Sequence, residues 1–385
     1  MGANERCRQA PSSLLATGSA HSAARIQPSR MRLGGVDLLR TIAVLAVLYS
    51  HISYYFVDDR GDGWWLIDLV QEGLIDGIKL NNHLSFVGVA FFMVLTGLLI
   101  TGSVTRHSAS NFLGNRIGRL LPLLWLSVAA AIVLVRMHIN GMFSPQDGIS
   151  NVEAGLSFVL GGFFLKPEVA VLGVTWTLTV QILFYLYCVA ARPLLRYAPA
   201  LVPIVGAALC GGALLYNDLV PAAATVPMLS KVAATMPAIF VGQIIYFAWT
   251  GLASRIWLLA ATAAQIGVVE LATELHAYWA GDRYLWTMTV VTATVLALAH
   301  CRGAIASSRA VHWVGTRSYA IYLLHTLILY RVFEHTVGWF GTTGAILAFL
   351  IVTAVASEVA YRVVEVPAGR WITDRLNRRE ARNRA

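Results

Sequence analysis

The chain has 385 residues, of which 57% are hydrophobic and only 13% are charged. Soluble domains carry about twice that charged fraction, so the composition excludes a soluble enzyme with one anchor and indicates an all-α protein with many membrane spans. The net charge of +9 fits cytoplasmic Arg residues in such a protein, and we expect no nucleic-acid partner. The four Cys residues are scattered and lack His neighbours, which argues against a disulfide framework and a metal site.

We predict three regions: a disordered basic cytoplasmic tail over 1–33, a membrane domain over 34–366 and a basic cytoplasmic tail over 367–385. Met31 precedes the first recognisable segment, so translation starts either there or at Met1. The short apolar stretch inside the first tail is too weak for a signal peptide.

Apolar runs long enough to cross a membrane lie at about 36–56, 85–105, 119–136, 173–191, 199–215, 232–249, 256–273, 284–300, 318–335 and 343–362. With ten spans and both termini inside, 22 of the 29 Lys and Arg residues fall on the cytoplasmic side. This asymmetry follows the positive-inside rule. It predicts a multi-pass membrane protein with both termini in the cytoplasm.

Two segments between these runs are expected to lie at the membrane surface. The outer segment 57–84 has apolar residues at helical spacing and carries Trp64 and Trp65, which indicates an interfacial helix. An aromatic-belt anchor is the favoured role of this Trp pair, and sugar binding is the alternative. The run at 152–165 is too short to span and is either re-entrant or interfacial.

The first apolar run contains Arg40 and His51, eleven positions apart. At about 3.6 residues per turn they share one helix face, and at ~1.5 Å per residue they stand ~16 Å apart along it. Ionisable groups inside a span are costly and indicate a functional site, although a snorkelling Arg and a structural His are the simpler interpretation. Asp37, three residues before Arg40, either orients that Arg or caps the helix.

Arg116 and Arg119 stand three apart at the predicted inner start of the third span, on the same membrane side as Arg40. Three guanidinium groups near helix N-termini suit phosphate. A plain positive-inside cluster or lipid-headgroup binding is the alternative.

Three later motifs carry polar residues into spans. Trp176 precedes Gln181 and Tyr185 in the fourth span, where Gln is more often structural than substrate-binding. Gly315-Thr-Arg-Ser-Tyr-Ala-Ile-Tyr-Leu-Leu-His-Thr326 places His325 inside the ninth span, where a satisfied core His is at least as common as a cavity residue. The motif Val364-Glu-Val-Pro-Ala-Gly-Arg-Trp371 ends the last span.

Together these motifs resemble the acyltransferase 3 family of polytopic inner-membrane enzymes that acylate sugars and other cell-envelope products, which implies a multi-pass protein of the inner (plasma) membrane. The opening Gly-Val-Asp-Leu-Leu-Arg-Thr-Ile-Ala-Val resembles the family start, with Arg40 and His51 matching its Arg-x10-His motif. The other matches, in order, are Phe91-Phe-Met-Val-Leu-Thr-Gly-Leu-Leu-Ile100, Arg116-Ile-Gly-Arg119 with Pro122, Trp176-x-Leu-x-Val with Phe184-Tyr185, Ser318-Tyr-Ala-Ile-Tyr-Leu-Leu-His325 and Glu365-Val-Pro367.

The resemblance implies transfer of an acyl group, most often acetyl, from cytoplasmic acyl-coenzyme A to a hydroxyl of a glycan or another envelope or exported acceptor. It implies acyl-CoA as co-substrate, with no permanently bound cofactor. Arg40, Arg116 and Arg119 would hold its phosphates, and His51 would act as general base or as acyl carrier. Asp37, Trp176, Gln181, Tyr185 and His325 are candidates for the acceptor side or the cavity.

Two departures from the family pattern bear on this prediction. Gln181 stands where the family usually has Glu, so the chain must do without that charge or use another group. The chain also lacks the extracytoplasmic hydrolase-like domain of some members, so the membrane domain works alone or with a separate extracytoplasmic partner.

Two other function classes compete with the enzyme. Intramembrane Arg and His would suit a proton-coupled transporter or a flippase for a small polar or lipid-linked molecule, although no inverted repeat is visible. A non-catalytic relative is the third reading.

Overall fold

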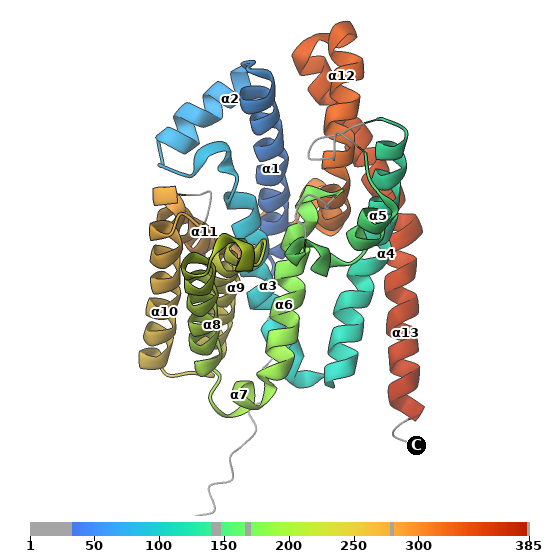
Figure 1. The fold of residues 1–385 in the computed structure, drawn as a ribbon. Helices are drawn as coiled ribbons and strands as arrows, with labels where there is room; N and C mark the ends of the chain where they lie inside the picture. Colours follow the sequence, from blue (N-terminus) through green and yellow to red (C-terminus); the bar gives the residue numbers. More distant parts are fainter. Residues whose placement is uncertain (1–32, 140–147, 166–170, 278–280, 383–385) are drawn as a thin grey trace, which may run out of the picture. The chain divides into compact units, whose positions relative to one another are not determined.

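The computed structural model describes residues 33–139, 148–165, 171–277 and 281–382, so the predicted tail over 1–33 lies almost wholly outside it. Within the described residues there are helices and no strands, which confirms the all-α prediction. The α-helices are α1 Val36–Tyr54, α2 Trp65–Val70, α3 Val87–Arg106, α4 Ala109–Arg136, α5 Asn151–Ser157, α6 Trp176–Ala190, α7 Arg192–Tyr197, α8 Leu201–Leu219, α9 Leu229–Thr250, α10 Arg255–Glu274, α11 Tyr284–Leu298, α12 Arg309–Ala360 and α13 Val366–Arg382 (Figure 1).

Eight helices in the described part of the chain are long and apolar enough to cross a membrane. Each of the ten predicted runs lies in a helix, but the last two share α12, and α11 is a shorter apolar helix. The polytopic prediction is confirmed, whereas the number of crossings and the side of the termini stay predictions.

The long helix α12 is a helical hairpin, because Gly341 within it has φ 64° and ψ 178°. We call the part before Gly341 the outgoing leg and the part after it the returning leg. A positive φ suits Gly, which has no Cβ to clash with the following carbonyl. The two legs meet again near their ends, where Trp313 Nε1 donates a hydrogen bond of 2.9 Å to Glu358 and Arg317 forms an ion pair with the same carboxylate. Residues near 315–325 and 358–365 are therefore neighbours in space.

Close helix packing at the centre depends on glycines. A Cβ on Gly97 of α3 would stand 1.9 Å from the carbonyl oxygen of Ile239, and a Cβ on Gly242 of α9 would stand 1.9 Å from that of Val94. Small residues let membrane helices approach backbone to backbone, where dispersion and weak polar contacts hold them. Helix α3 also packs on α1, and α1 in turn packs on α12, so α1 lies between α3 and α12.

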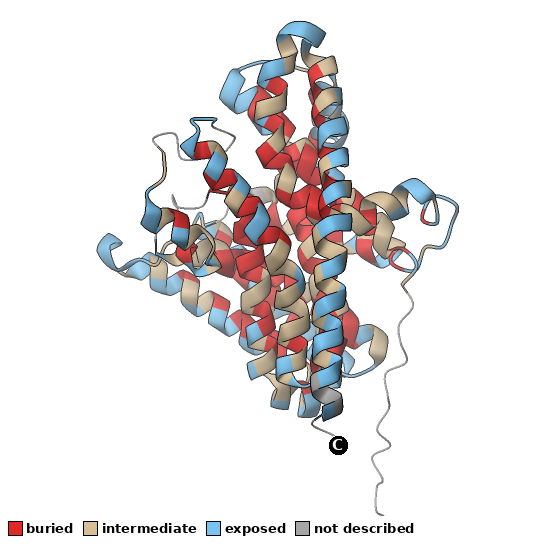
Figure 2. Cartoon of the chain, turned by 90° about the vertical axis from the view of Figure 1, so that its right-hand side faces the viewer, coloured by how far each residue is buried: buried red, intermediate tan, exposed pale blue. Residues whose placement is uncertain are grey.

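The C-terminal segment, predicted as a tail over 367–385, is helical as far as Arg382 and packs along α4. Gly114 and Gly118 of α4 face Leu376 and Ile372 of α13. In Figure 2 the helix that ends at the C label shows a largely exposed outer face, while buried residues gather where helices meet.

The predicted surface segments are also helical in part. The outer segment contains α2 followed by a wider helical turn over Gln71–Asp76. Trp64 packs on Phe56 and donates a hydrogen bond of 3.2 Å to Thr343 beside the turn of α12, whereas Trp65 is 60% exposed. The run at 152–165 holds most of α5, which begins with a capping box between Ser150 and Glu153.

Candidate functional site

A cavity of about 360 Å³ opens between α1, α3, α4, α6 and α12. Its volume lies in the range of small-molecule sites, which bury most of a ligand against apolar walls with a few placed polar groups. The apolar wall comes mainly from α3, and the polar lining residues are Arg40, Thr96, Arg116, Arg119, Thr177, Gln181, Tyr185, Thr316, Ser318, Tyr319, Tyr322, Tyr361 and Glu365. Five of the nine sequence-predicted residues therefore line one cavity: Arg40, Arg116, Arg119, Gln181 and Tyr185.

The three predicted arginines converge on this cavity from two helices. Arg40 lies in the second turn of α1, and Arg116 and Arg119 lie two to three turns inside α4. Helix α4 begins at Ala109, ten residues before the predicted span, because Ser108 caps it by accepting a hydrogen bond from the Asn111 amide. The expectation that all three arginines stand at helix N-termini is therefore wrong for those of α4, so their phosphate affinity must come from the guanidinium groups.

Glu365 is a cavity residue that was not among the predicted site residues, although its motif was. It lines the cavity at the end of the wide helical turn Tyr361–Glu365 that joins α12 to α13. Its carboxylate interacts electrostatically with Arg119 and Arg40, and its Oε2 is buried with no hydrogen-bond partner among the described residues. A buried carboxylate oxygen without a donor is an acceptor for a ligand N–H or O–H group.

Helix α6 contributes a second group of polar lining residues. Tyr185 is buried and its hydroxyl donates to Gln181 Oε1 at 3.4 Å. One turn earlier, Thr177 shares a hydrogen bond of 2.8 Å with the Tyr322 hydroxyl from α12. Tyr319 also lines the cavity and donates a hydrogen bond of 2.7 Å to the Leu120 carbonyl oxygen. The two tyrosines of α12 were missed, although Tyr322 stands three residues after Tyr319 and three before His325, a spacing that makes helix residues neighbours.

His51 and His325 lie together next to this group. Their ring centroids are 4.9 Å apart at an interplanar angle of 69°, and neither residue lines the cavity itself. Tyr322 connects the two regions, because it lines the cavity and its ring centroid is 6.0 Å from that of His325. His325 is 0% exposed, as expected for a core His, and it also contacts the predicted base.

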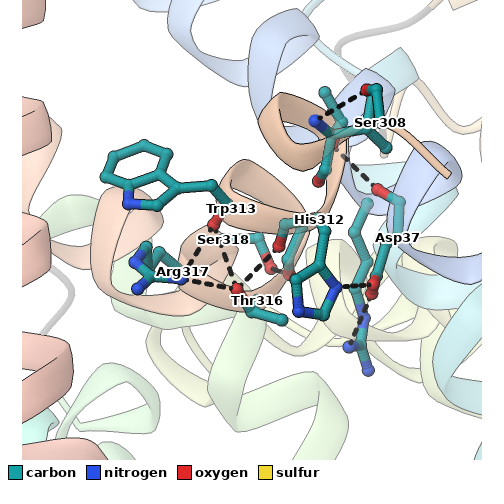
Figure 3. A network of polar contacts seen from close by, with 11 residues as sticks. Asp37, Ser308, His312, Trp313, Thr316, Arg317 and Ser318 are labelled. Carbon is teal, nitrogen blue, oxygen red and sulfur yellow. Dashed lines mark hydrogen bonds and ion pairs between the residues drawn. The ribbon is translucent and has the colours of Figure 1, made fainter. Parts of the chain in front are cut away.

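Asp37 and Trp176, like the two histidines, lie outside the cavity lining. Asp37 makes no helix-cap hydrogen bond; its carboxylate contacts His312 Nδ1 at 2.8 Å and lies 4.0 Å from Arg40 NH1 (Figure 3). It therefore links α1 to the start of α12 and stands where it can orient Arg40. Trp176 begins α6, and the ammonium nitrogen of Lys231 lies over its ring, 4.5 Å from the ring centroid.

Comparisons with known proteins agree with the family resemblance. The acyltransferase 3 family model, described as an acyltransferase domain, matches residues 33–362. Nodulation protein 10 of Rhizobium leguminosarum bv. viciae is 24% identical over 382 residues, which cover 89% of this chain and 95% of that protein. No solved structure matches the chain.

Proposed function

Since this chain belongs to the acyltransferase 3 family and is a multi-pass membrane acyltransferase, we propose that it acylates a hydroxyl group of a glycan or another exported acceptor, with acetyl-CoA as donor. The observation that carries the proposal is the convergence of Arg40, Arg116 and Arg119 on one cavity with a tyrosine-rich wall. Guanidinium groups bind phosphate through paired, charge-assisted hydrogen bonds, and coenzyme A is a thioester carrier with several phosphates.

The chemistry follows from the order of the residues along α1. The phosphates would lie at the arginines, and the thioester would reach toward His51, three helical turns or ~16 Å further along. There the imidazole would remove the proton of an acceptor hydroxyl as the oxygen attacks the thioester carbon. Direct attack by the imidazole on the thioester is the second route.

Glu365 gives the cavity a carboxylate although position 181 is Gln. Its unpartnered Oε2 suits a hydroxyl or amide donor, which both the pantetheine arm and a sugar provide. The name of the nodulation relative states no reaction, so the acceptor is proposed by class alone.

The decisive experiment is turnover of radiolabelled acetyl-CoA by the purified protein in lipid nanodiscs, with and without a panel of oligosaccharide acceptors. We expect thioester cleavage by the wild type, and loss of about 10²- to 10⁴-fold in kcat for His51→Ala with acetyl-CoA binding retained. The matched control is His335→Ala, an exposed His on α12 outside the cavity lining. A wild type that neither binds nor cleaves acetyl-CoA would reject the acetyl donor, and uptake of a solute without any acyl donor would favour a carrier.

A further inference from the structure

His325 has a fixed hydrogen-bond pattern that the proposed function has not used. It lies in the outgoing leg of α12, is 0% exposed, and its Nδ1 lies 3.1 Å from the carbonyl oxygen of Ile321. A carbonyl oxygen only accepts hydrogen bonds, so Nδ1 must carry the hydrogen. In the neutral ring the lone pair is then on Nε2.

That lone pair has an unusual environment. Nε2 of His325 is buried and has no hydrogen-bond partner among the described residues. Leaving a buried acceptor unpaired costs about 1–3 kcal/mol, and such groups in folded proteins call for an explanation. If His325 served only to fill space, a hydrocarbon side chain would pack equally well and would avoid that cost.

A neighbouring ionisable group explains the arrangement. The ring of His51 stands edge-on to the ring of His325 with 4.9 Å between the centroids, so the two imidazole rings are in contact. The base of the proposed reaction and an unpaired imidazole lone pair are therefore adjacent, on two helices that pack together.

We propose that His325 is the proton partner of His51: its Nε2 receives the proton that His51 takes from the acceptor hydroxyl. The new O–C bond forms as the C–S bond of the thioester breaks, and the hydroxyl proton passes through His51 to Nε2 of His325. It returns by the same route to the departing thiolate, which leaves as the free thiol of coenzyme A. The step rests on the proposed function and needs no oxidant or reductant.

Substitutions can separate this role from a structural one. His325→Asn places an amide N–H near the position of Nδ1 and so keeps the bond to Ile321, but it has no atom at the position of Nε2. His325→Gln reaches the position of Nε2 but cannot carry a proton. We expect both to lower kcat about 10²-fold or more with the Kd for acetyl-CoA unchanged. We expect added imidazole to restore part of the turnover of His325→Ala.

The matched control is His335→Asn. His335 lies on the same leg, and its Nδ1 also contacts the carbonyl oxygen four residues earlier, that of Arg331, at 2.7 Å. His335 is exposed, so this variant should keep wild-type kcat.

Wild-type kcat in His325→Asn would overturn the proton-partner role while leaving the proposed function intact. A fall in kcat that imidazole does not restore and that matches a fall in Tm would also overturn it, in favour of packing alone. Absence of acetyl-CoA turnover in the wild type would overturn the proposed function and the proton-partner role with it.

Discussion

Arg317 on the outgoing leg of α12 forms an ion pair with Glu358 on the returning leg. The same carboxylate accepts hydrogen bonds from Trp313 and Arg362, and the Arg317 guanidinium stacks on Tyr361 with 4.5 Å to the ring centroid. This network closes the hairpin beside the cavity, since Thr316, Ser318 and Tyr361 line it. Figure 3 shows Arg317 with its further hydrogen bonds to Thr316 and to the Trp313 carbonyl oxygen, next to the Asp37–His312 contact.

We expect Glu358→Ala to lower the Tm of the detergent-solubilised protein, because it leaves Arg317 and Trp313 without their shared acceptor. The measurement is thermal aggregation followed by size-exclusion chromatography. Glu274→Ala, an exposed acid at the end of α10, is the control and should leave Tm unchanged. Equal Tm values for the two variants would show that the hairpin closes without this carboxylate.

The contact between α3 and α9 gives a second stability prediction. Gly242→Ala places a methyl group against the Val94 carbonyl oxygen, so the helices must separate, at a cost of about 1–3 kcal/mol. Gly212→Ala in α8 meets nothing within 4 Å and should be neutral or mildly stabilising. Thermal unfolding of both variants in one detergent checks the pair, and a Tm for Gly242→Ala at or above that of Gly212→Ala would contradict the packing argument.

Donor affinity should depend on the cavity arginines and not on basic residues in general. Arg116→Ala or Arg119→Ala each removes hydrogen bonds to a charged group, worth about 1.5–3 kcal/mol, so we expect acetyl-CoA to bind about 10- to 150-fold more weakly. Arg255→Ala, at the exposed start of α10, is the charge-matched control and should bind normally. Isothermal titration in nanodiscs measures all three, and equal affinities would remove the phosphate role of the arginines.

The predicted topology can be read by thiol labelling in a variant whose four native Cys residues are replaced by Ala. With ten crossings and both termini inside, Glu72→Cys should react with an impermeant maleimide on intact cells, and Ser307→Cys only after permeabilisation. Both positions are exposed, so accessibility on the protein itself is not limiting. Labelling of both cysteines from outside would contradict the predicted crossing number.

The sequence determined the features that depend on local pattern. Apolar runs place the spans because a lipid-embedded backbone must satisfy its own hydrogen bonds, which leaves helices as the simplest solution. A costly Arg inside the first run identified Arg40, and the pair at the start of the third run identified Arg116 and Arg119; all three line one cavity. The motifs also carried the family, which the model match over residues 33–362 confirms.

Only the tertiary structure decided which motifs meet. The turn at Gly341 brings the two legs of α12 together, and the helix α13 that follows leaves Glu365 facing Arg40 and Arg119. The periodicity of a single helix cannot predict that Glu365 lies near these arginines, because its distance from α1 depends on packing between helices that are remote in sequence. The contact between His51 and His325 has the same origin. The sequence of each helix sets the face on which its His lies, but only the packing of α1 on α12 brings the two rings together.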